Sequence, residues 1–174
     1  TAVTKFIIYG CNSGADKTKT AQYWMVGSLS GADWGKVKYV AVAFAFIIVL
    51  ILLFVNELDV LLLGDDVAES LGVNTGRIKR IIILAATALT GVVVSVSGVI
   101  GFIGLVVPHI VRSIVGSKHK RLLPAVILTG GLFTMLADVI SRIVIAPEEL
   151  PIGIISAFIG APFFLYLIKK NRAG

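Results

Sequence analysis

Two long stretches without a charged residue constrain the fold more than any other feature of the chain. Tyr39–Val55 holds 17 such residues and Ile81–Pro108 holds 28. A helix needs about 20 predominantly apolar residues to cross the ~30 Å hydrocarbon core of a bilayer. With 57% hydrophobic residues and a mean hydropathy of +0.97, the chain is also far more apolar than an average soluble domain. The sequence therefore predicts an all-α, polytopic transmembrane helix bundle.

We expect about five membrane spans in a single transmembrane domain that covers residues 1–174. The expected spans are residues 36–56, 77–96, 99–115, 122–145 and 151–169. The second and third spans must be separate, because one helix over Ile81–Pro108 would rise about 1.5 Å per residue and be much longer than a bilayer is thick. Ser97, Gly98 and Gly101 favour a break there. Residues 1–35 are predicted to hold the end of a further span and an outer loop or short helix.

An acidic insert at residues 57–76 separates the first two spans. It carries half of the ten acidic residues of the chain, namely Glu57, Asp59, Asp65, Asp66 and Glu69. Asp66 and Glu69 have the spacing of a capping box with Asp in place of Ser or Thr. Val67, Ala68 and Leu71 would give a short helix an apolar side, and Gly72 would end it. The pattern indicates a helix that docks with a partner protein, and a solvated turn is the alternative.

Lysine and arginine are distributed unequally between the two ends of the expected spans. The end with the acidic insert carries Arg77, Lys79, Arg80, Arg112, Lys118, Lys120, Arg121, Lys169, Lys170 and Arg172. The opposite end has Arg142 between spans, together with Lys17, Lys19, Lys36 and Lys38 from the N-terminal segment. Because cytoplasmic loops carry the excess of basic residues, we expect the insert and the C-terminus to be cytoplasmic. The net charge of +6 then indicates contact with anionic lipid headgroups rather than with nucleic acid.

Small residues recur four positions apart in two of the expected spans. Thr87, Gly91 and Ser95 share one helix face, as do Ser156 with Gly160 and Ala157 with Ala161. Such spacing lets two helices approach closely in lipid, although small residues are also common in membrane helices generally. We therefore expect a closely packed bundle.

The sequence offers few groups that could perform catalysis. It contains no Gly-rich phosphate loop, no HExxH and no GxSxG motif, and Cys11 is its only cysteine. His109 and His119 share no metal-ligand spacing, so no metal site and no cofactor are expected. His109 is expected to cap or anchor a helix end. Asp138 and Arg142 lie four residues apart on one helix face and are expected to pair, which leaves part of the Arg142 guanidinium for a carboxylate outside.

Four segments in order resemble the FecCD-type permease subunit of bacterial ABC importers for iron–siderophore, haem and cobalamin. They read YWMVGSLSGADW, LLLGDDVAESLGVN, GFIGLVVPHIVR and LPIGIISAFIGAPFFLYLIKK. The resemblance implies a ten-helix permease in the inner membrane that pairs as a homodimer or heterodimer. It also implies two cytoplasmic ATP-binding subunits, which hydrolyse ATP, and an extracytoplasmic substrate-binding protein. The permease itself would not be an enzyme.

The resemblance covers the second half of such a permease, from the end of the fifth helix through the tenth. It leaves open whether the first half belongs to the same polypeptide, and which chelate is transported. The family's coupling loop falls on Gly64, Asp65, Asp66, Ala68, Glu69, Leu71 and Gly72. Its outer arginine, which meets an acidic residue of the binding protein, falls on Arg142. Residues expected at helix contacts or along the pathway are Gly91, Ser95, Gly101, Gly104, Pro108, Ser156 and Gly160.

Two other classes of membrane protein remain open at this point. An ion-coupled secondary transporter usually buries acidic residues at mid-membrane or breaks helices around an ion site. In this chain Asp138 is the one acidic residue within an expected span, and it lies toward one end. A structural membrane-anchoring subunit is the third possibility.

Overall fold

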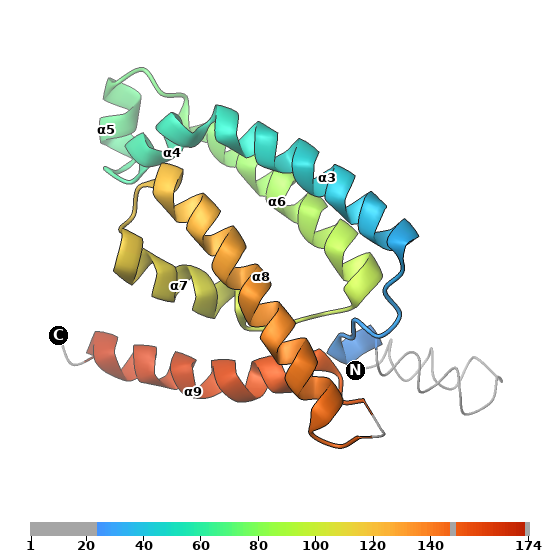
Figure 1. The fold of residues 1–174 in the computed structure, drawn as a ribbon. Coiled ribbons are helices and arrows are strands. Elements are labelled where there is room, and N and C mark those ends of the chain that lie inside the picture. The colour runs from blue at the N-terminus through green and yellow to red at the C-terminus, as the bar shows by residue number, and fades with distance from the viewer. Residues whose placement is uncertain (1–23, 147–148, 173–174) are drawn as a thin grey trace, which may run out of the picture.

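The computed structural model describes residues 24–146 and 149–172, and the elements assigned within these residues are helices. They are α3 (Trp34–Leu53), α4 (Val55–Leu61), α5 (Asp65–Ser70), α6 (Thr75–Ser97), α7 (Ile103–Val115), α8 (His119–Ile143) and α9 (Ile152–Arg172) (Figure 1). The all-α prediction is confirmed. The span end expected before residue 24, together with Lys17 and Lys19, lies outside the described residues.

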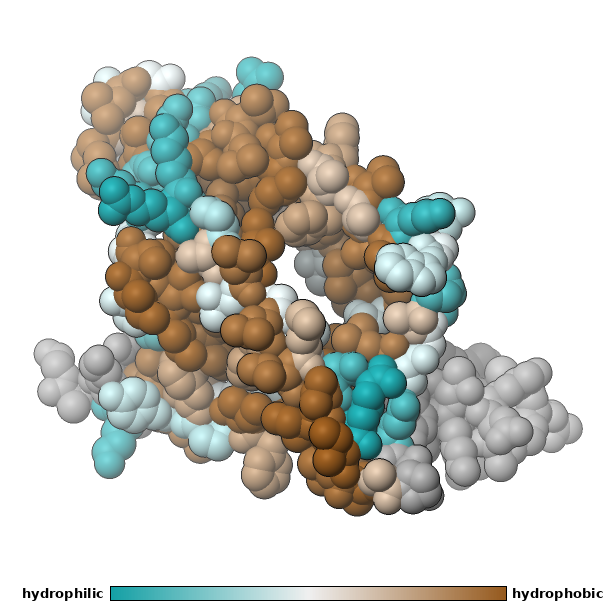
Figure 2. Space-filling model, viewed as in Figure 1, coloured by the Kyte–Doolittle hydropathy of each residue, from teal (hydrophilic) through white to brown (hydrophobic). Residues whose placement is uncertain are grey.

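Within the described residues, four helices are long and apolar enough to cross a membrane. They are α3, α6, α8 and α9, and their bounds differ from the expected ones by at most three residues. Few of their residues are buried within the chain, between 6% and 22% of each apolar window. Figure 2 shows the consequence, because apolar residues cover much of the visible face and hydrophilic residues gather toward its ends. The described part of the chain therefore presents its apolar side chains to lipid or to other protein.

The expected third span, residues 99–115, is helical only from Ile103 to Val115. The helix in this region, α7, has 13 residues and rises only about 20 Å, which is too short to cross a bilayer alone. Residues 98–102 are not helical. Gly98 ends α6 with a φ of +68°, and a Cβ there would overlap the backbone of Trp24. The chain thus turns back at the end of α6 before α7 begins.

Residues 24–28 provide the hydrogen bonds that this non-helical segment needs. The Ser28 N–H donates to the Ser97 carbonyl at 2.9 Å, and the Val99 N–H donates to the Trp24 carbonyl at 3.3 Å. Non-helical backbone at membrane depth is tolerated where protein satisfies its polar groups. The break between α6 and α7 is therefore stabilised by a segment some 70 residues earlier in the chain, as the pairing of Ser28 with Ser97 shows.

The acidic insert lies at one end of the bundle. Helices α4 and α5 are found where α3 ends and α6 begins, and α4 also contacts α8 (Figure 1). The start of α8 is at this end, so Arg142 near its last turn lies at the other. The buried centre is formed largely by α7 against α8, through Val107, Val111 and Leu122.

Candidate functional site

Helix α5 of the insert is firmly attached to the rest of the chain. Ala68 is fully buried at 0% exposure. Gly72 has a φ of +83° and ends the helix as expected, with its N–H donating to the Glu69 carbonyl at 2.9 Å. The Val73 N–H donates to the Ala68 carbonyl at 3.0 Å, which completes a Schellman motif. A helix of only six residues is thereby held in one position.

The expected capping box is wrong. Helix α5 begins two residues early, at Asp65, and its N-cap is Gly64, which has no side chain to accept a hydrogen bond. Glu69 is then too far along the helix to reach back to the N-cap, and its carboxylate instead accepts from the Thr75 hydroxyl at 2.8 Å. Asp65 pairs with Lys79 of α6 at 2.5 Å. Both acidic residues thus attach α5 to α6 instead of capping α5.

The three apolar residues expected on one side of α5 lie on two different sides. Ala68 faces the protein, whereas Val67 and Leu71 are 43% and 62% exposed, and Leu63 just before the helix is 63% exposed. Asp66 is exposed beside them and has no side-chain partner among the described residues. We call Leu63, Asp66, Val67 and Leu71 the α5 outer face. Ala68 belongs to the anchor of α5 and not to a surface that another protein could touch.

Helix α4 was not expected from the sequence, although Val55, Leu58 and Leu61 have helical spacing. It brings Asp59 to the start of α8. One Asp59 carboxylate oxygen accepts from the His119 backbone N–H at 2.7 Å and lies 2.6 Å from the His119 ring Nδ1. Burial alone would raise the pKa of the Asp59 carboxyl. The hydrogen bonds from His119 and the charges of His119 and Lys118 outweigh burial and lower this pKa below its ordinary value of 3.8.

Arg142, at the opposite end of the bundle, contacts two carboxylates. Its Nε donates to Asp138 at 2.9 Å, so the expected pairing is present, and a terminal nitrogen donates to Glu149 at 3.4 Å. The Arg142 side chain nevertheless remains 43% exposed. A guanidinium has five N–H donors, so these bonds leave donors of Arg142 for a further acceptor.

The two small-residue faces of α9 have different surroundings. Ser156 and Gly160 of α9 are buried, and a Cβ at Gly160 would lie 2.6 Å from Cγ of the Phe102 ring. Phe102 itself has a φ of +65°, which is unusual for a bulky residue. Ala157 and Ala161, on the neighbouring face of α9, line an open hollow of about 520 Å³ with Val26 and Phe158.

The remaining glycines expected at helix contacts have no close neighbours in the described chain. Gly91 and Ser95 are exposed on α6, and a Cβ at Gly91, Gly101 or Gly104 would meet nothing within 4 Å. Their role in packing or in a pathway stays a prediction. Pro108 lies inside α7 and is partly buried.

His109 was expected at a helix end, and this is wrong. It lies in the middle of α7, with its ring edge-on to Phe163 of α9 at a centroid distance of 6.1 Å. The helix begins later than expected, at Ile103, so that His109 has about as many residues before it as after it. This ring contact connects α7 to α9.

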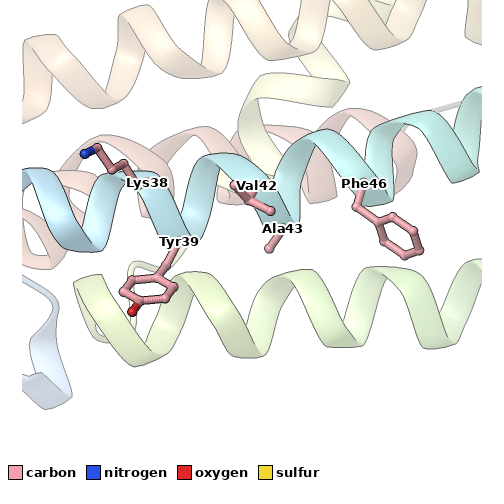
Figure 3. Close-up of a pocket in the computed structure, with 5 residues that line it drawn as sticks. All are labelled: Lys38, Tyr39, Val42, Ala43 and Phe46. Atoms are coloured by element: carbon pink, nitrogen blue, oxygen red, sulfur yellow. The ribbon is translucent and has the colours of Figure 1, made fainter.

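A second hollow, of about 560 Å³, follows the outer face of α3. It is lined by Lys38, Tyr39, Val42, Ala43 and Phe46, which all come from this one helix (Figure 3). A binding cavity needs walls from several elements that converge on a ligand. This hollow is therefore the open, apolar surface of a membrane helix and not a ligand site.

The sequence matches the FecCD transport family over residues 1–170. It is 43% identical to the cobalamin import system permease protein BtuC of Halobacterium salinarum over 171 residues, 98% of this chain and 45% of that protein. It is 45% identical to the Fe(3+) dicitrate transport system permease protein FecD of Escherichia coli, over 87% of this chain and 48% of that protein. It is 41% identical to the hemin transport system permease protein HmuU of Yersinia pestis, over 86% of this chain and 45% of that protein.

A solved structure has the same fold. It is assigned to the metal-chelate type of ABC transporter in an inward-facing conformation, and it matches with a TM-score of 0.84 and 31% identity. The match covers 94% of this chain and 53% of that one, so the chain spans about half the length of the relatives it matches. Both the sequence match over residues 1–170 and the shared fold lead to one assignment: the chain belongs to the FecCD transport family.

Proposed function

We propose that this chain forms part of the membrane-spanning subunit of an ATP-driven importer for a metal chelate. The relatives are described as permeases for cobalamin, ferric dicitrate and hemin, which are all large organic complexes of a metal ion. The observation that carries the proposal is the α5 outer face. It combines exposed apolar side chains with a rigidly held helix at one end of a bundle of membrane helices.

The α5 outer face suits an ATP-binding partner subunit for two reasons. Val67 and Leu71 lie on the polar insert beyond the membrane spans, so their exposed side chains are not explained by contact with lipid. Exposed apolar groups outside the membrane mark contact sites with other proteins. Ala68, Glu69 and Asp65 hold the helix in place, so that a force applied to α5 is passed on to the bundle. ATP is hydrolysed in the partner, and the permease itself is not an enzyme.

We infer a cytoplasmic location for the insert and the C-terminus in an inner membrane. The supporting observation is that basic residues cluster in the first two turns of α6 and at the start of α8, at the insert's end of the bundle. Lys36 lies at the other end of the bundle and would favour the reverse orientation. Its charge is largely balanced nearby, because its Nζ lies 3.5 Å from Asp33 and donates to the Gly31 carbonyl. Arg142 then faces outward, where a substrate-binding protein with an acidic residue would dock.

The open hollow on α9 is suited to a second permease copy. Small residues at Ala157 and Ala161 permit close approach of another helix, whereas the Ser156 and Gly160 face is already occupied by Phe102. The chelate would pass between the two copies. An ion-coupled carrier is less well supported, because Asp138 is the one acidic residue in the described span helices and Arg142 already pairs with it.

Cross-linking from single positions tests these assignments in the assembled transporter. A photoreactive residue at Val67 is expected to form an adduct with the ATP-binding subunit, because this side chain is exposed on the α5 outer face. The same residue at Ala157 is expected to join two permease copies. Val144, which is 58% exposed at the far end of α8, is the control and should give no adduct with the ATP-binding subunit. An adduct with that subunit from Val144 but not from Val67 would overturn the proposed orientation and docking site.

A further inference from the structure

Helix α8 is held by side chains at both of its ends. At its first turn, Asp59 of α4 accepts from the His119 backbone N–H and contacts the His119 ring. At its last turn, Arg142 pairs with Asp138 and reaches Glu149 in the loop that follows. The helix has 25 residues, so it is long enough to connect the insert's end of the bundle to the opposite end.

The start of α8 depends on Asp59 because it lacks a cap of its own. Its N-cap residue is Lys118, which makes no side-chain capping bond. The first N–H groups of a helix need acceptors from elsewhere, and a carboxylate there is also favoured by the helix dipole. Asp59, 60 residues away in sequence, provides this acceptor. The two side chains are only 17% and 27% exposed, so water competes weakly for these bonds.

We propose that Asp59 is a positioning residue that joins the coupling insert to α8, so that a displacement of α5 moves α8 with it. Helix α5 packs on α4, and α4 packs on α8, which places Asp59 on the route between the two. The inference rests on the proposed function, because it assumes that a partner subunit moves α5. It adds a residue outside the α5 outer face that decides whether this motion reaches the membrane helices.

The hydrogen bond from the His119 backbone N–H to Asp59 is expected to persist across the physiological pH range. The bond from the His119 backbone N–H does not depend on the protonation of the ring. On the acceptor side, the pKa of the Asp59 carboxyl is lowered on folding. A group whose pKa is lowered on folding contributes its stabilisation above its ordinary pKa, here 3.8, and loses it as the pH falls through the lowered value. The carboxylate is therefore charged wherever a cytoplasmic protein works.

The test measures chelate uptake per ATP hydrolysed in proteoliposomes that hold the complete transporter. Asp59→Ala is expected to lower this ratio about 10-fold, which corresponds to about 1.4 kcal/mol, because it removes the acceptor that joins α4 to the start of α8. Asp59→Asn should recover most of the ratio, because Asn accepts at an N-cap as well as Asp does. His119→Gln keeps the backbone N–H and should stay within about twofold of the unmodified protein.

His119→Pro provides an independent variant that preserves the helix. Proline is favoured at the first helical position, which His119 occupies, and Lys118 already has the extended backbone that a following proline requires. It removes both donors to Asp59, so its ratio should fall as in Asp59→Ala. The inference is overturned if His119→Pro and Asp59→Ala couple normally, if both lose uptake and ATP hydrolysis in proportion, or if Asp59→Asn is no better than Asp59→Ala. An unmodified transporter that shows no ATP-driven uptake would instead refute the proposed function.

Discussion

Leu71→Glu is expected to lower ATP-driven uptake by at least about 100-fold while the permease still inserts and assembles. The Leu71 side chain is 62% exposed, so the permease alone tolerates a carboxylate there. In the complex, the same carboxylate would be buried against the partner without a counter-charge. An uncompensated charge at a buried contact costs several kcal/mol, and about 2.7 kcal/mol is already 100-fold. The measurement is uptake together with the amount of ATP-binding subunit that copurifies with the permease.

Two further variants define what the Leu71→Glu result means. Ser117→Glu adds the same charge at an exposed position outside α5, in the loop between α7 and α8, and is expected to leave uptake within about twofold. Ala68→Glu should impair folding of the permease itself. Ala68 is fully buried, so a carboxylate there would displace α5 and reduce the yield of folded permease. Normal uptake and normal copurification in Leu71→Glu would remove the α5 outer face from the interface.

Arg142→Glu is expected to weaken binding of the substrate-binding protein by about 100-fold. The variant replaces a half-exposed guanidinium by a carboxylate, and like charges at an interface cost several kcal/mol. It also places three carboxylates together, since Asp138 and Glu149 both contact Arg142. The measurement is the binding isotherm of the binding protein on reconstituted transporter.

Two compensating substitutions distinguish a role of Arg142 within α8 from a role in docking the binding protein. If Arg142 meets a carboxylate of the binding protein, changing that carboxylate to a basic residue should restore part of the affinity of Arg142→Glu. If Arg142 acts only within α8, adding Asp138→Arg in the same chain should restore it instead, because the pair is re-formed with exchanged charges. Arg142→Lys is the conservative control. Undiminished affinity in Arg142→Glu would exclude this residue from the docking surface.

The membrane helices could be predicted from sequence because their signal is local. Uncharged runs of about 20 residues fix α3, α6, α8 and α9 without any knowledge of their neighbours. The segment between α6 and α7 shows the limit of this reasoning. Residues 98–102 are apolar, but the turn they form is stabilised by hydrogen bonds from Ser28 to Ser97 and from Val99 to Trp24, which composition does not reveal.

The conformation of the acidic insert was predicted only in part. The spacing of Asp66 and Glu69 suggested a cap, yet the start of α5 depends on the backbone at Gly64, and Glu69 bonds to Thr75 instead. Helical spacing put Ala68 and Leu71 in one set, although only the packing of α5 shows that one is buried and the other exposed. The Asp59–His119 contact joins residues 60 apart, so no motif could indicate it.

A measurement of which energy source drives transport tests the central proposal most directly. Proteoliposomes would contain the complete permease, its ATP-binding subunit and the substrate-binding protein, and would be offered radiolabelled cobalamin, ferric citrate and haem in turn. We expect one of these chelates to accumulate when ATP is supplied on the side of the insert, and not when a proton or sodium gradient is imposed without ATP. Accumulation driven by the ion gradient alone, with no response to ATP, would contradict the account.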